Sequence, residues 1–197
     1  MLAQANERVN HADLCLRAVR WLRGTRRCNP VYSLNASCSE VPDAIGWSSA
    51  HSWYGSTVIE CKTSVSDFYA DKKKWFAWKR PGSKWTMPGS RFSMKEGKEA
   101  GYEMVPVLSM GDFRFYFCEL GVLALELIEK HAPDHGLIWR DGRVMRIIRT
   151  APRREMVDKD AEIRYLRFAI INRKWTQDVS SASTATTTNT AMTPCVP

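Results

Sequence analysis

The segment STVIECKT (56–63) places Glu60 and Lys62 two residues apart in a run that is otherwise typical of a buried strand. Residues two apart in a strand share a face, so these two charged side chains point the same way. Burying an unpaired charge is costly, and this face therefore needs partners of opposite charge. The upstream segment SEVPDAIGW (39–47) is predicted to form a neighbouring strand, which would bring Asp43 close to Glu60.

Two neighbouring carboxylates beside an amine suit a divalent cation. Asp43 and Glu60 would repel each other unless a cation lay between them. Mg²⁺ takes oxygen ligands and uses one or two protein carboxylates, so the backbone carbonyl of Cys61 is the candidate third ligand and Mn²⁺ the alternative ion. A metal-bound water, with Lys62 stabilising charge on the phosphate, would hydrolyse a phosphodiester. The competing interpretation is a plain ion pair between Glu60 and Lys62 on an exposed sheet face.

The elements that must position these residues indicate an α/β fold, with a mixed central β-sheet flanked by helices. The strands are predicted at 29–36, 39–47, 56–63, 112–119 and in a hairpin over 136–149 that turns at Asp141-Gly142. The helices are predicted at 10–23, 64–80, 124–132 and 158–175. The apolar positions expected to face the core are Phe68, Trp75 and Phe76, then Phe113, Phe115 and Phe117, and finally Ile163, Leu166, Ile170 and Ile171.

The chain is predicted to form one domain over 1–178, followed by a disordered Ser/Thr-rich tail over 179–197. Within the domain, 78–104 is predicted to be a basic loop that contains Trp78 and Trp85, because Gly, Pro and Ser interrupt any periodicity. Cations interleaved with aromatic rings suit nucleic acid, since phosphates take the cations and bases stack on the rings. The alternative is a solvated loop whose tryptophans pack back onto the core. The candidate phosphate contacts are Lys72, Lys73, Lys74, Lys79, Arg80, Lys84 and Arg91, with Lys95 and Lys98 in the same basic stretch.

The charge balance favours a polyanionic partner. The 197 residues carry a formal charge of +8, with a pI near 9.3 and eight tryptophans. Nucleic acid is the first candidate and an anionic membrane surface the second, while a generically basic surface is the alternative. The sequence contains no apolar run of the roughly 18 residues that a bilayer span requires, so no membrane association is expected.

The first residues lack the apolar core of a signal peptide, which predicts a cytoplasmic protein with reduced cysteines. None of the six cysteines forms a C-x-x-C pair, so a structural zinc site is not expected. Cys28 and Cys38 remain an alternative pair of ligands for an irregular site.

Beyond these arguments, VPD (41–43) followed by IECK (59–62) resembles the PD-(D/E)XK nuclease superfamily. The segment ECKTSVSDFYADKKKWF is similar to the E-x-K-x-S-x-x-D-F-x-x-D-x-K block of small phage-encoded and bacterial repair-type members. The later segments GDFRFYFCELG, HGLIWRDGRVMRIIRTAP and YLRFAI resemble further blocks of that branch in the same order. The resemblance spans about 10–172, and the stretch 78–104 is longer than the family connection.

The resemblance implies a restriction-endonuclease-like core in which Asp43, Glu60 and Lys62 match the three signature residues. Many relatives add an acid from the first helix, for which Asp13 is preferred here over Glu7, although an acid at a helix start also fits the helix dipole. Asp67 and Asp71 match acids of the branch's own block.

The first functional hypothesis is a Mg²⁺- or Mn²⁺-dependent DNA endonuclease or nickase, with a phage origin and a homodimer as further expectations. The second is a catalytically silent nuclease-fold adaptor or inhibitor that binds DNA or a host or phage protein. A metal-free RNA-binding protein is the third.

Overall fold

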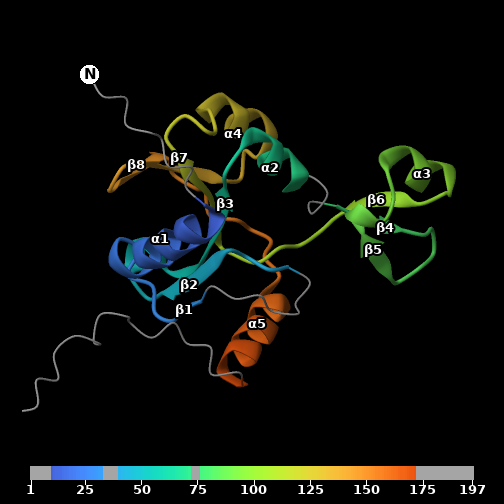
Figure 1. The fold of residues 1–197 in the computed structure, drawn as a ribbon. Coiled ribbons are helices and arrows are strands. Elements are labelled where there is room, and N and C mark those ends of the chain that lie inside the picture. Colours follow the sequence, from blue (N-terminus) through green and yellow to red (C-terminus); the bar gives the residue numbers. More distant parts are fainter. Residues whose placement is uncertain (1–9, 33–39, 72–75, 172–197) are drawn as a thin grey trace, which may run out of the picture.

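The computed structural model describes residues 10–32, 40–71 and 76–171. Six strands form a mixed sheet in the order β1-β2-β3-β7-β8-β9 (Figure 1). The central strands β3, β7 and β8 are parallel, and the other neighbours are antiparallel. The strands are β1 (Val31–Tyr32), β2 (Ala44–Ser48), β3 (Gly55–Lys62), β7 (Phe113–Glu119), β8 (Gly136–Asp141) and β9 (Val144–Arg149). The predicted α/β fold with a mixed central sheet flanked by helices is thus confirmed.

Helices cover both faces of this sheet (Figure 1). The helix α1 packs on one face, while α2, α4 and α5 pack on the other. The helices are α1 (His11–Gly24), α2 (Val65–Ala70), α4 (Leu125–His131) and α5 (Lys159–Ile171), and a short 3₁₀ turn, η1 (His51–Trp53), precedes β3. None of the helices in the described ranges combines the length and apolar composition that a bilayer span needs.

The helix α1 begins where the sequence predicts. The Asn10 side chain accepts a hydrogen bond from the backbone N–H of Asp13 at 2.8 Å, which satisfies one of the free donors of the first turn. Leu14, Ala18 and Leu22 follow at helical spacing and are buried against the sheet. This cap fixes the orientation of the first turn, which carries His11.

The face under α1 is largely apolar, and it also holds the buried Arg26, whose guanidinium lies 3.3 Å from the centre of the Trp53 ring and donates to Thr57. Phe113, Phe115 and Phe117 alternate along β7 on this face as predicted, and they pack with Ile59 and Cys61 of β3. The opposite face contains two smaller apolar clusters, one under α5 and one under α2 and α4. Glu60, Lys62 and Arg114 belong to this second face, since residues two apart in a strand share a side with Val58 and Tyr116.

The predicted loop over 78–104 is wrong, because these residues build a small lobe of their own. A three-stranded antiparallel sheet in the order β5-β4-β6 carries one helix, and the lobe stands apart from the central sheet (Figure 1). Its elements are β4 (Phe76–Lys79), β5 (Thr86–Pro88), a 3₁₀ turn η3 (Gly89–Arg91), α3 (Met94–Glu99) and β6 (Glu103–Pro106).

Trp78 is the centre of the lobe and is fully buried there. Its indole N–H donates to the Gly89 carbonyl, and its ring lies directly against Gly97, where an added Cβ would meet ring atoms at 2.6 Å. The predicted helix over 64–80 therefore ends early: α2 stops at Ala70, and Phe76 begins a strand. Trp75 lies outside the described residues.

Two further expectations are corrected. The β8–β9 hairpin turns at Gly142 and Arg143, one residue later than predicted, because Asp141 still pairs with Val144 and only Gly142 has a positive φ. In α5, Ile163, Ile170 and Ile171 are exposed, and the buried side is formed instead by Ala161, Glu162, Tyr165 and Ala169. Glu162 turns inward because polar groups of the sheet hold its carboxylate.

Candidate functional site

Asp43 lies directly before β2, at the point where β2 stops pairing with β3. Ala44 pairs with Ile59, so Asp43 and Glu60 occupy the next positions on adjacent strands. The Asp43 carboxylate (Oδ2) accepts a hydrogen bond from the Cys61 backbone N–H at 2.7 Å. The carbonyl of a strand residue points to the same side as its N–H, so the Cys61 carbonyl is also directed toward Asp43. The structure thus brings Asp43 beside the predicted Glu60–Lys62 segment.

The Glu60 side chain is almost completely buried and lies beside a cation that the sequence did not identify. The Arg114 guanidinium contacts Glu60 Oε1 at 3.3 Å and Glu40 Oε1 at 2.5 Å. Burial alone would lower the pKa of Arg114, but the two carboxylates outweigh it and raise that pKa above its ordinary value. Glu60 thus lies against a buried arginine from the neighbouring parallel strand.

Lys62 is buried as deeply as Glu60. Its ammonium lies 2.7 Å from the Asp71 carboxylate and 4.0 Å from that of Asp67, both at or beyond helix α2. The Tyr116 ring lies 6.0 Å from the same nitrogen. The exposed-face interpretation of Glu60 and Lys62 is therefore wrong: only 4% and 3% of these residues is accessible to solvent.

The Cys61 thiol, on the α1 side of β3, experiences the field of both acids. Its hydrogen bond with Cys15, its burial and the nearby charges of Asp43 and Glu60 all raise the pKa of Cys61 well above the ordinary thiol value.

The other predicted metal contact lies elsewhere. Asp13 accepts hydrogen bonds from Arg17 at 2.9 Å and from Arg140 at 2.8 Å, and the hydrogen bond from Arg17 contributes most to lowering the pKa of Asp13. The first-helix residue that does contact Asp43 is His11, whose Nε2 lies 3.2 Å from Oδ2. The signal for His11 was its place at the first turn of the helix that must pack over Asp43.

The predicted nucleic-acid contacts divide into two groups. Lys72, Lys73 and Lys74 lie outside the described residues. The others belong to the small lobe, where Trp85 is 85% exposed and Trp78 is buried. The lobe cations Arg80, Lys84, Arg91, Lys95 and Lys98 are exposed, and Lys79 is half-buried.

A layer of charged groups continues from Arg114 away from Glu60. Arg114 donates to His135, whose ring stacks on Tyr116 with centroids 4.8 Å apart, and His135 bonds Asp134 at 2.7 Å. The hydrogen bond from His135 lowers the pKa of Asp134 to about 2. Burial lowers the pKa of His135 despite the neighbouring Asp134, and Arg114 and Arg154 act in the same direction as burial.

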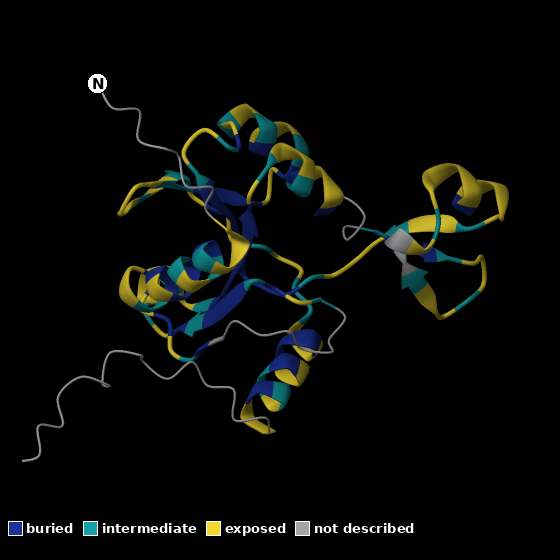
Figure 2. Cartoon of the chain, viewed as in Figure 1, coloured by how far each residue is buried: buried dark blue, intermediate teal, exposed yellow. Residues whose placement is uncertain are grey.

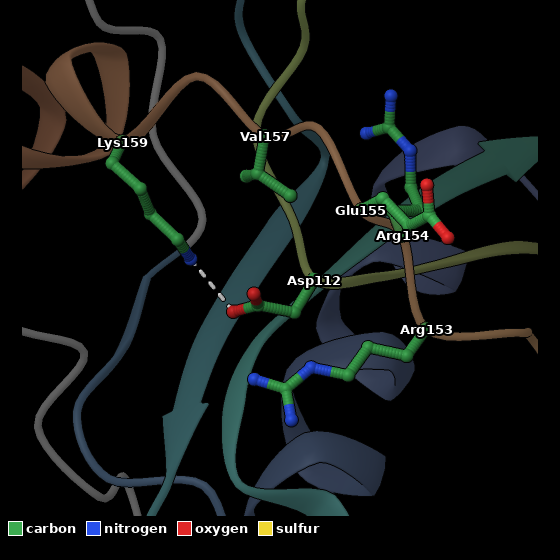
Figure 3. Close-up of a pocket in the computed structure, with 6 residues that line it drawn as sticks. All are labelled: Asp112, Arg153, Arg154, Glu155, Val157 and Lys159. Atoms are coloured by element: carbon green, nitrogen blue, oxygen red, sulfur yellow. Dashed lines mark hydrogen bonds and ion pairs between the residues drawn. The ribbon is translucent and has the colours of Figure 1, made fainter.

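A separate open cavity of about 530 Å³ lies at the other end of β3, beside the start of α5 (Figure 3). Figure 3 shows Lys159 reaching Asp112, at 2.7 Å. Asp112 also accepts hydrogen bonds from the Ser56 backbone N–H and hydroxyl. The same Ser56 hydroxyl lies 2.7 Å from a carboxylate oxygen of Glu162. These groups satisfy one another and attach α5 to the sheet, so they form a structural network rather than a second candidate site. The cavity lining comprises Asp112, Arg153, Arg154, Glu155, Val157 and Lys159.

No family model matches the chain, and no curated protein matches it. Among solved structures, a protein of unknown function from Silicibacter pomeroyi is similar with a TM-score of 0.45 and 19% sequence identity. The match covers 84% of this chain and 88% of that one. This likeness is too weak to assign a fold family or an activity.

Proposed function

We propose that the protein is a divalent-metal-dependent deoxyribonuclease that hydrolyses DNA phosphodiester bonds. The observation that carries the proposal is the hydrogen bond from the Cys61 backbone to Asp43, which fixes one carboxylate beside the strand that bears Glu60 and Lys62. The sequence resemblance supports the same three residues. The net charge of +8 is what a DNA-binding protein needs.

The donor chemistry at this position fits a hard divalent ion. Asp43 and Glu60 would hold Mg²⁺ or Mn²⁺ with the Cys61 carbonyl, and the bound ion would supply charge neutralisation and an acidified water. Within the described residues, no hydrogen bond occupies Oδ1 of Asp43, so one oxygen of this carboxylate is available to a ligand. Lys62, oriented by Asp71, would stabilise negative charge on the scissile phosphate.

The small lobe supports binding rather than chemistry. It carries six cations against three carboxylates and a nearly fully exposed Trp85 next to Lys84. An exposed ring beside cations suits a base and its phosphate, because stacking is sequence-tolerant and the cations neutralise the backbone. The lobe would therefore hold DNA while the central sheet cleaves it.

The test is cleavage of supercoiled plasmid and of labelled oligonucleotides with Mg²⁺, Mn²⁺ or EDTA. We expect metal-dependent nicking or cleavage that falls at least about 100-fold in Asp43→Asn, Glu60→Gln and Lys62→Met, because each removes charge from the reacting centre.

The chain contains its own matched control, a second E-x-K copy at Glu96-Gly97-Lys98 on the exposed α3. Glu96→Gln and Lys98→Met make the same chemical changes in the small lobe, outside the proposed centre, and should leave cleavage at saturating DNA intact. Cleavage that survives in all three site variants would remove this assignment.

DNA affinity provides a second, independent measurement. Lys84→Ala and Trp85→Ala should weaken DNA binding, and Lys84→Ala should lower the dependence of log Kd on log salt by about one. Neither change touches the central sheet, so cleavage at saturating DNA should be retained. A binding constant that does not change with salt would contradict a nucleic-acid role for the positive charge.

A nuclease-fold adaptor is the second candidate, and one observation favours it. Glu60 lies against Arg114, and Lys62 lies against Asp71, in a layer almost closed to solvent. Groups held this way can stabilise a fold without reacting. Tight, salt-dependent DNA binding with no cleavage in any metal would establish the adaptor instead.

A further inference from the structure

The exposed end of α1 carries a second set of metal-binding groups that is chemically different from the carboxylates of the central sheet. His11 and Cys15 lie one helical turn apart on the same face of α1, and Asp43 lies next to both. Among the described residues, this is the one group of three such side chains whose ligand atoms all lie within 4.8 Å of one another.

The separations are those of ligands around one small ion. With bonds of about 2.0–2.3 Å in tetrahedral geometry, two ligand atoms stand roughly 3.3–3.8 Å apart. His11 Nε2 lies 3.2 Å from Asp43 Oδ2 and 4.0 Å from Cys15 Sγ. All three ligand atoms lie within 4.8 Å of one another, and the half-exposed His11 side chain has the freedom to move the imidazole toward a common centre.

The chemical types of the three ligands indicate which metal ion the site would prefer. A thiolate, an imidazole and a carboxylate together favour a borderline transition metal such as Zn²⁺, whereas Mg²⁺ prefers oxygen alone. The Cys61 N–H that donates to Asp43 orients the carboxylate, as outer-shell groups do in metal sites. Three protein ligands with an exposed histidine on one side leave a fourth position for water.

We propose that His11, Cys15 and Asp43 form an open three-ligand site for Zn²⁺ or a similar transition-metal ion. This site differs from the structural zinc site that the absence of a C-x-x-C pair argued against, because it uses one thiolate and keeps an open position. It shares Asp43 with the proposed nuclease centre, but metal binding to it does not depend on nuclease activity.

The test uses Co²⁺ as a spectroscopic substitute for Zn²⁺ on the full-length protein. A Cys15 thiolate bound to Co²⁺ gives a charge-transfer absorption in the near ultraviolet, and addition of Zn²⁺ should displace it. We expect this absorption in the unmodified protein and its loss in Cys15→Ser. His11→Ala should weaken Zn²⁺ binding, measured by calorimetry, by on the order of tenfold or more, since even outer-shell changes cost 10–100-fold.

Matched controls separate this site from adventitious binding. Cys28→Ser changes a buried cysteine of the same core whose thiol donates to the Arg26 carbonyl, a bond that serine can keep. His51→Ala changes another exposed histidine. Both should retain the cobalt spectrum and the Zn²⁺ affinity, and circular dichroism should show that every variant is folded.

The outcomes also separate this inference from the proposed function. Glu60→Gln should lose cleavage and keep the cobalt spectrum. The metal site would be disproved if the unmodified protein shows no thiolate absorption, or if that absorption survives in Cys15→Ser. Loss of the absorption in Cys61→Ser but not in Cys15→Ser would equally overturn the assignment, because it would place the thiolate on β3.

Discussion

The two faces of the central sheet are both buried, but they differ in the number of charged groups that they hold. Under α1, the alternating residues Ile59, Cys61 and Phe115 are apolar and fully buried. On the other face, their immediate neighbours Glu60 and Arg114 are charged and 4–6% exposed. Figure 2 shows the central strands as buried. One side of the sheet is thus a largely apolar core in which the buried Arg26 stacks on aromatic rings, whereas the other side holds paired carboxylates and cations.

This difference between the two faces favours the charged face as the place of the proposed chemistry. An apolar face needs only shape complementarity, whereas each buried charge needs a partner to compensate its desolvation. Replacing a buried ion pair with apolar residues is often neutral or stabilising, so the charge layer is not explained by stability alone. Because Asp43 occupies the position opposite Glu60 on the adjacent strand, we propose that this layer serves the chemistry of that site.

The largest stability effect is expected on the apolar face. Phe115→Ala should lower the free energy of unfolding by about 3–5 kcal/mol, because it leaves a cavity under α1 where the Trp21 ring now meets Phe115 edge-on at 5.6 Å. Chemical denaturation measures this change. Val144→Ala on the exposed β9 is the control and should change stability by no more than about 0.5 kcal/mol. An effect of Phe115→Ala below that of the control would mean that the core is not built on β7.

On the charged face we expect a smaller loss of stability, which a second substitution should partly reverse. Arg114→Met should destabilise the protein by about 3 kcal/mol, because it leaves the carboxylates of Glu40 and Glu60 without their shared cation. Adding Glu60→Gln should then recover part of the loss, since the uncompensated charge is removed. A double variant that is as unstable as the sum of the two single variants would show that Arg114 and Glu60 are not coupled.

The charge layer should also make stability depend on pH, through His135. Its pKa is lowered by burial, so in the folded protein the ring stays neutral below the unfolded value near 6.5. As pH falls below about 6.5, the unfolded chain takes up a proton that the folded protein does not. Stability should therefore fall toward acid, by at most about 1.4 kcal/mol per pH unit from this group.

His135→Gln should remove this pH dependence between pH 7 and 5, as measured by urea denaturation at several pH values. His51→Gln, at an exposed histidine, should leave it unchanged. Asp134 contributes in a separate, more acidic window. Its lowered pKa stabilises the folded protein above pH 3.8, and this stability is lost as pH falls from the ordinary value of 3.8 to the folded value of about 2. A His135→Gln variant with the full pH dependence would assign the effect to another group.

The alternation of side chains along a strand can be predicted from the sequence. Alternation in β3 is enough to place Glu60 and Lys62 on one face and Cys61 on the other. It could not identify Arg114 as a partner, because that contact requires β3 and β7 to pair in parallel with Val58 opposite Arg114. Such register is set by packing across the whole sheet.

The small lobe was missed for a related reason. Its strands are three or four residues long and depend on Trp78, so no local run reveals them. One local signal was present: Ser93 and Glu96 form a reciprocal capping box at the start of α3. In α5, hydrophobicity alone favoured Ile163 as a buried position. Ser56 and Gly111 instead hold the Glu162 carboxylate, so that Glu162 faces the core and Ile163 faces solvent.

The smallest effect should come from the cap of α1, the helix that covers the apolar face. Asn10→Ala removes the acceptor for the Asp13 N–H and should cost about 1 kcal/mol in thermal or chemical unfolding, while Asn10→Ser should restore most of it because a hydroxyl can accept the same bond. The change leaves every ligand of the proposed transition-metal site in place but frees the turn that carries His11. Zn²⁺ affinity should therefore fall along with stability, and an unchanged affinity would show that Asp43 and Cys15 alone determine the position of the ion.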